Sequence, residues 1–318
     1  MRGATVTKGG RLTRGRPPLW PALRGWLVAG VFVAPLGNGC TTYVDQVPGD
    51  SEPPPDHRPL PEAPDPLDPA DPQPEVLADG LSSPRGLVQI GDDLYVADHG
   101  AGAVLEVALD GTVATVATDL GGPRELATDG TDLFLSDDAG GRVLRLALDG
   151  QHSVLASGQL RPVRVRVAAS FAYWVDEGEN PGSGWVSGAI RRVSTAGGTV
   201  EDLAVDLERP RALAVSSLHA FFSDGEVPSR MWRVPLSGRQ PEQLVQVDEE
   251  LAFDAVVDES ADALFWVAYA PPWPSTGWVY RSSLDGLQND RVIHTGPKVL
   301  RVAIDGSHVY WSDRDLLA

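Results

Sequence analysis

Cysteine is almost absent from this 318-residue chain, which contains only Cys40. A single cysteine excludes an internal disulfide framework, so its thiol needs another explanation. Long hydrophobic runs are missing as well. The run at residues 26–36 is too short to span a bilayer, which takes about 20 apolar residues in a helix. The apolar residues also lack a 3.6-residue period, which argues against a helical protein.

Recognisable catalytic motifs are absent too. The sequence has no Gly-x-Ser-x-Gly elbow, no glycine-rich phosphate loop and no Asp-x-Asp-x-Asp-Gly calcium loop. Its six histidines do not follow metal-ligand spacing. These absences favour a protein without catalytic activity.

Basic residues are scarce, with 26 Lys and Arg against 44 Asp and Glu, and the formal net charge is −18. Residues 1–39 hold six basic residues and no acid, and residues 40–75 hold nine acids and one basic residue. Residues 76–318 therefore carry a net charge of −16. So acidic a domain repels nucleic acid and anionic lipid, and we exclude nucleic-acid binding.

The first 39 residues have the pattern of an export signal, with a basic start, a short apolar run and small residues before a boundary. Because Cys40 is the first residue past that boundary, the segment resembles a bacterial lipoprotein signal. The resemblance implies that Cys40 is acylated with the two chains that stable anchoring requires. Thr41, in place of Asp, implies sorting to the outer membrane. The alternative is an ordinary signal peptide followed by a free thiol.

Residues 40–75 are rich in Pro, Asp and Glu and offer almost nothing apolar to bury. Such a segment stays extended and solvated. At about 3.1 Å per residue in polyproline II, it could hold a domain up to roughly 100 Å from its anchor. We therefore expect a disordered tether that presents residues 76–318 to the periplasm or the cell surface.

The remainder of the chain is a repeat. In four copies a proline precedes an aspartate by fourteen positions: Pro84 and Asp98, Pro123 and Asp137, Pro162 and Asp176, and Pro210 and Asp224. A fifth copy has Ala268 at the aspartate position, and a sixth ends at Asp313. Each full copy contains four short apolar runs separated by turn residues, which is the pattern of a four-stranded antiparallel propeller blade. The repeat predicts an all-β, six-bladed propeller.

The stretches YWVD at residues 173–176 and YWSD at residues 310–313 resemble the YWTD and NHL class of six-bladed, TolB-like propellers. The resemblance implies the fold of residues 76–318. It implies little about function, because this fold hosts receptors, scaffolds, lactonases and lyases.

The sixth copy supplies only two strands before the chain ends. Residues 76–79 match an outer strand without a blade of its own. We expect them to close the last blade directly beside the Tyr310 segment, because an open ring would leave exposed strand edges. The alternative is that the reading frame is truncated.

The repeat brings charged positions together at one end of the blades. Arg85, Arg124 and Arg211 begin the innermost strand of their copies, and the aspartates Asp98, Asp137, Asp176, Asp224 and Asp313 end the second. These aspartates predict a structural latch, in which a carboxylate accepts backbone N–H groups or an arginine fork. The functional alternative is a ring of alternating charges that binds a polar ligand at the channel mouth.

Two copies have enlarged loops at this end, at residues 176–185 and 269–278. Insertions in repeat proteins often form the binding face. With Glu177, the aromatic residues of these loops are our candidate contacts for an envelope protein, a peptide or a carbohydrate: Tyr269, Trp273, Trp278 and Trp185. The alternative for Trp185 and Trp278 is packing within the blades.

The main prediction is therefore a lipid-anchored, non-catalytic binding module that acts through the loops of this top face. The alternative is a lactonase-like or lyase-like enzyme with a divalent cation such as Ca²⁺ in the central channel. Lactonase relatives hold such a cation with carboxylates and an asparagine. The corresponding acids here are Asp254 and Glu125, and no asparagine lies on an innermost strand.

Overall fold

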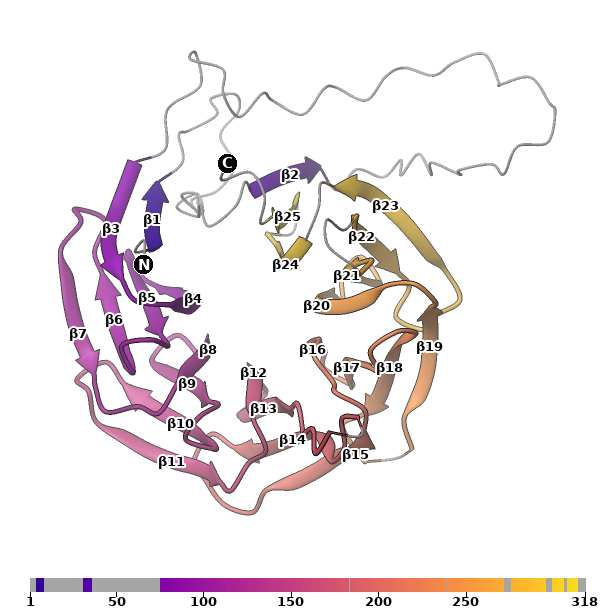
Figure 1. Cartoon of the computed structure of the whole chain (residues 1–318), viewed down its shortest axis with the longest axis horizontal. Coiled ribbons are helices and arrows are strands. Elements are labelled where there is room, and N and C mark those ends of the chain that lie inside the picture. Colours follow the sequence, from indigo (N-terminus) through magenta and orange to yellow (C-terminus); the bar gives the residue numbers. More distant parts are fainter. Residues whose placement is uncertain are drawn as a thin grey trace, which may run out of the picture.

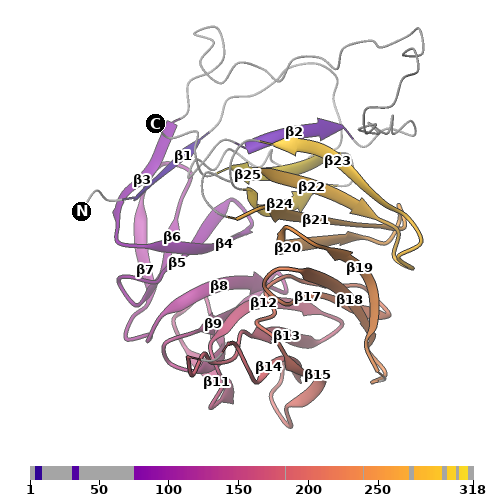
Figure 2. The same ribbon diagram turned by 45° about the vertical axis from the view of Figure 1, so that its right-hand side comes forward.

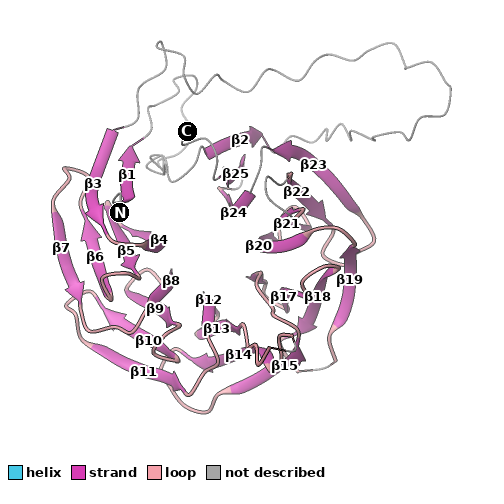
Figure 3. Ribbon diagram, in the orientation of Figure 1, coloured by secondary structure: helices cyan, strands magenta, loops and turns pink. Residues whose placement is uncertain are grey.

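The computed structural model describes residues 4–8, 31–35, 75–182, 184–238, 240–271, 276–295, 299–305 and 308–313. These residues form strands and loops (Figure 3). No helix within these ranges has the length and apolar character needed to cross a membrane. Cys40 and Trp273 lie outside the described residues, as does the side chain of Asp313.

Five antiparallel sheets of four strands are arranged radially round a common centre (Figure 1). The first two blades are β4 (Pro84–Ile90), β5 (Asp93–Asp98), β6 (Ala103–Val107) and β7 (Val113–Ala117), then β8 (Pro123–Thr128), β9 (Asp132–Asp137), β10 (Arg142–Ala147) and β11 (His152–Ser157). The third is β12 (Pro162–Ala168), β13 (Phe171–Asp176), β14 (Gly188–Ser194) and β15 (Glu201–Leu207). The fourth and fifth are β16 (Leu213–Val215), β17 (His219–Asp224), β18 (Ser229–Pro235) and β19 (Glu242–Val247), then β20 (Leu251–Asp258), β21 (Ala263–Tyr269), β22 (Gly277–Ser282) and β23 (Asn289–Thr295).

The burial of each strand follows its place in the blade. The second strands, such as β9 and β13, are buried at five of their six residues because neighbouring blades cover both of their faces. The outer strand β7 is exposed at its first three residues. Continuous apolar runs therefore mark the middle of each blade, and polar or mixed runs mark the rim, as the sequence predicts.

The hydrophobic core is divided among the interfaces between successive blades. Between the first and second blades, Tyr95 and Val104 pack with Leu133 and Leu144. Equivalent clusters join each later blade to the next, up to Val267 of the fifth and Trp311 of the sixth. The turned view shows the blades side by side round the ring (Figure 2). Stability is therefore spread over many similar interfaces, as in other repeat proteins.

The sixth blade differs from our expectation. It has three strands, in the order β2 (Val31–Pro35), β25 (His308–Asp313) and β24 (Val299–Ile304). The predicted closing segment forms β3 (Glu75–Leu81), which pairs with β1 (Ala4–Lys8) and not with β25. An N-terminal strand does join the blade, but it comes from residues 31–35 and the blade still has one strand fewer than the others. Residues 31–35, VFVAP, are apolar and include two β-branched valines, a composition that favours a strand.

β3 nevertheless packs as the outer strand of a blade does. Leu77, Ala78 and Leu81 bury their side chains against Leu94 and Val96 of the first blade. The residues 39 positions later, Val116, Ala117 and Leu120, occupy the same place between the first and second blades. The sequence similarity between β3 and β7 therefore corresponds to an equivalent packing position in the structure.

In the first four blades, the repeated aspartates tie the preceding outer strand to the inner strands of the blade. Asp137 accepts backbone N–H groups from Gly121 (3.2 Å) and Gly122 (2.6 Å), which lie between β7 and β8. Asp98 accepts in the same way from Ser82 and Ser83, both at 2.7 Å. These are the hydrogen bonds of a latch.

The third and fourth copies repeat the contact with fewer bonds. Asp176 accepts from the N–H of Leu160 (3.3 Å), and Asp224 from that of Glu208 (2.6 Å). Side chains add to the latch in two copies, where Arg142 contacts Asp137 and Arg191 contacts Asp176. The residue four positions before each repeat proline has a positive φ, which opens the turn toward the carboxylate: Gly80, Asp119, Gly158 and Asp206.

We expect Asp137→Ala to cost about 3–5 kcal/mol of stability, because a fully buried carboxylate then leaves three N–H groups and Arg142 without their acceptor. Asp224→Ala removes fewer contacts and should cost about 1–2 kcal/mol. Urea denaturation of the two variants measures the difference. Equal costs would mean that the hydrogen bonds do not set the strength of the latch.

Candidate functional site

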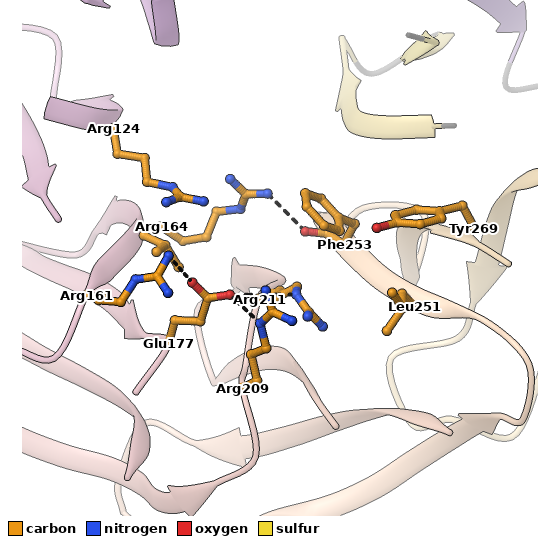
Figure 4. A pocket seen from close by; sticks show the side chains of 10 residues that line it. Arg124, Arg161, Arg164, Glu177, Arg209, Arg211, Leu251, Phe253 and Tyr269 are labelled. Carbon is orange, nitrogen blue, oxygen red and sulfur yellow. Dashed lines mark hydrogen bonds and ion pairs between the residues drawn. The ribbon is translucent and has the colours of Figure 1, made fainter. Parts of the chain in front are cut away.

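A pocket of about 250 Å³ lies where the innermost strands begin and the second strands end (Figure 4). Blades two to five contribute to it. Five of its ten lining residues are arginines, against one carboxylate: Arg124, Arg161, Arg164, Arg209, Arg211, Glu177, Val163, Leu251, Phe253 and Tyr269. In a domain with a net charge of −16, this is a local concentration of positive charge.

The repeat places these arginines within two residues of its prolines. Arg161 and Arg209 each come directly before a repeat proline, and both have a positive φ, of 60° and 55°. Such a φ is uncommon for a residue with a long side chain and is often found at functional sites. Arg164 and Arg211 follow the same prolines at the start of their copies, which gathers all four guanidinium groups at one end of the third and fourth blades.

Glu177 is the centre of the first charge cluster. Its carboxylate contacts Arg161 (3.2 Å), Arg209 (2.8 Å) and Arg211 (3.9 Å). The side chain of Glu177 is only 5 % exposed, so these pairs lie in an environment of low dielectric. Glu226 contacts Arg209 and Arg211 from the solvent side. We call these five residues the rim cluster.

Trp185 belongs to the edge of the pocket. Its ring lies under the guanidinium groups of Arg161 and Arg209, at 5.1 and 4.2 Å from the ring centre. Each is a cation–π contact, which holds the charged group in a fixed place without neutralising it. The enlarged loop of the third blade therefore supports two arginines of the site.

The opposite wall of the pocket is aromatic. The rings of Phe253 and Tyr269 are tilted against each other with centres 5.7 Å apart. Leu251 lies beside them (Figure 4). Arg164 bridges the two walls, since it lies 5.7 Å from the Phe253 ring and donates a 3.0 Å hydrogen bond to the carbonyl of Phe253.

A second cluster of charges, the axial cluster, joins the inner strands β8, β12, β20 and β24. Glu125 contacts Arg164 (3.1 Å), Arg166 (3.3 Å) and Arg301 (2.9 Å). Asp254 contacts Arg166 (3.1 Å) and Arg164 (3.7 Å). These pairs cross between blades that are far apart in the sequence.

Burial alone would raise the pKa of Glu125, but Arg301, Arg164 and Arg166 together lower it to about 2. Burial, with Arg301 in the same direction, lowers the pKa of Arg164 to about 10. Both groups are therefore charged at neutral pH. The axial cluster is therefore a network of ion pairs in which Glu125 is ionised.

The two acids that the enzyme alternative assigns to a metal do not fit that role. Glu125 and Asp254 direct their carboxylates to three arginines, whose charges repel a divalent cation. In the described part of the chain, no three His, Cys, Asp or Glu side chains form a group that could hold a metal ion. The arginine N–H groups on these strands suit an anion better than a cation.

The structure brings together four of the predicted ligand contacts, because Tyr269, Glu177, Arg124 and Arg211 all line the pocket. Trp185 lies at its edge. Arg85, exposed at the start of β4, does not line the pocket.

Trp278 belongs to β22 and packs against the core between the fourth and fifth blades. It takes the packing role that the sequence analysis gave as the alternative. Trp273 lies outside the described residues.

Sequence reasoning missed Arg161, Arg209 and Phe253. The first two had a readable signal, since the dipeptide Arg-Pro opens the third and fourth copies but not the first two. Phe253 had none, because a phenylalanine on a strand normally predicts core packing.

We expect Glu125→Gln to lower the free energy of unfolding by about 3 kcal/mol at neutral pH, the equivalent of a pKa lowered from 4.5 to about 2. A lowered pKa stabilises the fold above pH 4.5, and this contribution is lost as the pH falls through about 2. The stability difference between wild type and variant should therefore shrink as the pH is lowered across this range.

Denaturation at several pH values measures this difference. The control is Glu242→Gln, which removes an exposed partner of Arg233 and should cost less than about 1 kcal/mol. A Glu125→Gln variant as stable as this control would show that the axial cluster contributes nothing net.

No family model matches the chain, and no curated protein matches it. Several solved structures share its fold. A gluconolactonase from Xanthomonas campestris is 18% identical, with a TM-score of 0.54 over 74% of this chain and 88% of the other. Nidogen, in a complex with laminin, is 18% identical, with a TM-score of 0.52 over 69% and 84%.

A putative TolB from Agrobacterium tumefaciens is 14% identical, with a TM-score of 0.53 over 70% of this chain and 85% of that one. Identities this low establish the architecture and leave the activity open. The chain has the fold of the YWTD/NHL-like and TolB-like six-bladed β-propellers, with an incomplete last blade.

Proposed function

We propose that the protein is a non-catalytic binding module that recognises an envelope partner through the face carrying the arginine pocket. The observation that carries this proposal is the pocket itself, which joins four blades at one mouth and presents five arginines beside an aromatic wall. Arginine forks bind carboxylate and phosphate groups, and aromatic rings add contact area at low entropic cost. A polar or charged group of a protein, a peptide or a carbohydrate fits this surface.

The carboxylates of the site support binding over catalysis. A general acid or base needs a pKa near the working pH and a free proton path. Glu125 has a pKa of about 2, and Glu177 is held by three arginines. Glu125 is therefore unsuited to exchange a proton at neutral pH, and the carboxylate of Glu177 is committed to its ion pairs.

We also propose that Cys40 is the lipid attachment point and that residues 40–75 act as the tether. The support is the signal-like start, the single cysteine and the proline-rich acidic linker. The net charge of −16 on the following domain would keep the propeller away from an anionic bilayer surface, so only the lipid would contact the membrane. The outer membrane is the proposed location.

Processing ahead of Cys40 would remove β1 and β2 from the chain. β3 and β25 would each lose a hydrogen-bonded neighbour. The sixth blade is therefore the part of the propeller that we expect to change most between the full and the processed chain.

The binding proposal is tested by capture from an envelope extract with the immobilised full-length protein. We expect the wild type to retain a partner that an Arg211→Gln variant loses, because Arg211 lines the pocket and is 6% exposed. Arg233→Gln is the matched control, since Arg233 pairs with Glu242 on the outer strands of the fourth blade. A partner held equally by all three proteins would place the binding surface elsewhere.

The anchor is tested by growth with a radiolabelled fatty acid. We expect the label in the wild-type protein and none in Cys40→Ser, because Cys40 is the only cysteine in the chain. Mass spectrometry of the first peptide provides a second measurement. An unlabelled wild-type protein that begins at residue 40 with a free thiol would support the ordinary signal peptide instead.

A further inference from the structure

The rim cluster has an excess of positive charge. Arg161, Arg209 and Arg211 share two carboxylates, those of Glu177 and Glu226. Three positive charges against two negative ones leave one unbalanced. Arg211 is 6% exposed and the side chain of Glu177 is 5% exposed, so solvent screens the inner part of the cluster only weakly. Arg161 and Glu226, with side chains 45% and 47% exposed, form its solvent side.

The axial cluster has the same imbalance. Arg164, Arg166 and Arg301 share Glu125 and Asp254, which again leaves one positive charge. Arg164 belongs to the axial cluster and also lines the pocket, so the two excesses adjoin. The remaining pocket arginine, Arg124, is balanced by Asp138 at 2.7 Å.

The axial cluster also contains buried donors without acceptors. Arg164 is 4% exposed, and its Nε has no hydrogen-bond partner. The nearest acceptor that pairs with this nitrogen is Asp254 at 3.7 Å, beyond hydrogen-bond distance. Nη1 of Arg301 is buried without a partner as well. Buried donors are normally satisfied, so these two nitrogens call for an explanation, and a bound anion or water is one that the surrounding charges favour.

We infer that the pocket binds a small soluble molecule that carries two negative charges, as a phosphate monoester or a pair of carboxylates, on an apolar or aromatic body. This inference rests on the proposed function and specifies its ligand. One charge matches the excess of the rim cluster, and the second would pair with Arg164, the member of the axial cluster that lines the pocket. The apolar body would lie on the wall formed by Phe253, Tyr269 and Leu251. A lipid head group with the same chemistry is disfavoured, because the domain carries a net charge of −16.

The experiment is calorimetric titration of the full-length protein with four probes. Phenyl phosphate and benzene-1,3-dicarboxylate carry two charges, benzoate carries one, and benzyl alcohol none. We expect one-to-one binding of the two dianions, about tenfold or more tighter than that of benzoate, and no binding of benzyl alcohol. Vesicles of phosphatidylcholine with phosphatidic acid provide the lipid arm.

Two variants change the charge of the rim cluster in opposite directions. Arg209→Gln removes its excess positive charge and should weaken phenyl phosphate binding about tenfold. Glu226→Gln raises the excess and should tighten binding about threefold, because Glu226 competes for the same two arginines. Loss of folding cannot produce tighter binding. Arg233→Gln is the control and should bind like the wild type.

Equal affinity for benzoate and phenyl phosphate would overturn the inference, as would an unchanged affinity in Glu226→Gln or binding to the vesicles alone. The two proposals can fail separately. An envelope partner that is lost in Arg211→Gln, but is not displaced by phenyl phosphate, would leave the proposed function standing and remove the dianion. Phenyl phosphate binding without any envelope partner would leave the dianion site standing and remove the proposed function.

Discussion

The carboxylate latch is the contact on which the rest of the structure depends. In the first four blades, the aspartate at the end of the second strand holds the backbone turn that enters the blade, as Asp137 holds Gly121 and Gly122. The turn therefore has a fixed path just before the repeat proline. Arg161 and Arg209 occupy that position, so the same hydrogen bonds that join the blades also place two arginines of the pocket.

The charge around the pocket is opposite in sign to the net charge of the domain. The domain as a whole is acidic, yet its inner strands and the turns next to them gather arginines in two clusters that each exceed their acids by one. Each guanidinium of the two clusters contacts at least one carboxylate, which offsets the cost of removing the charges from water. The surrounding negative surface would slow the approach of an anion, whereas the local excess would hold one that enters the pocket.

The fold alone does not choose between a binding protein and an enzyme. Its solved neighbours include a gluconolactonase and nidogen in a complex with laminin. The choice depends on the inner strands. Acids on these strands could hold a cation, but in this chain Glu125 and Asp254 are paired with arginines. The binding proposal therefore rests on side chains and not on architecture.

The sequence by itself determined the blades, because strand alternation, turn residues and the fourteen-residue spacing from Pro84 to Asp98 are local patterns. It also predicted that Glu177, Tyr269, Arg124 and Arg211 lie on one face, since equivalent positions in a repeat share a side of the ring. Only the tertiary structure decided that Arg164 and Arg166 pair with Asp254, some 88 residues away from Arg166. It also decided which N-terminal segment lies beside β25. Both depend on distances across the ring, and no local pattern encodes them.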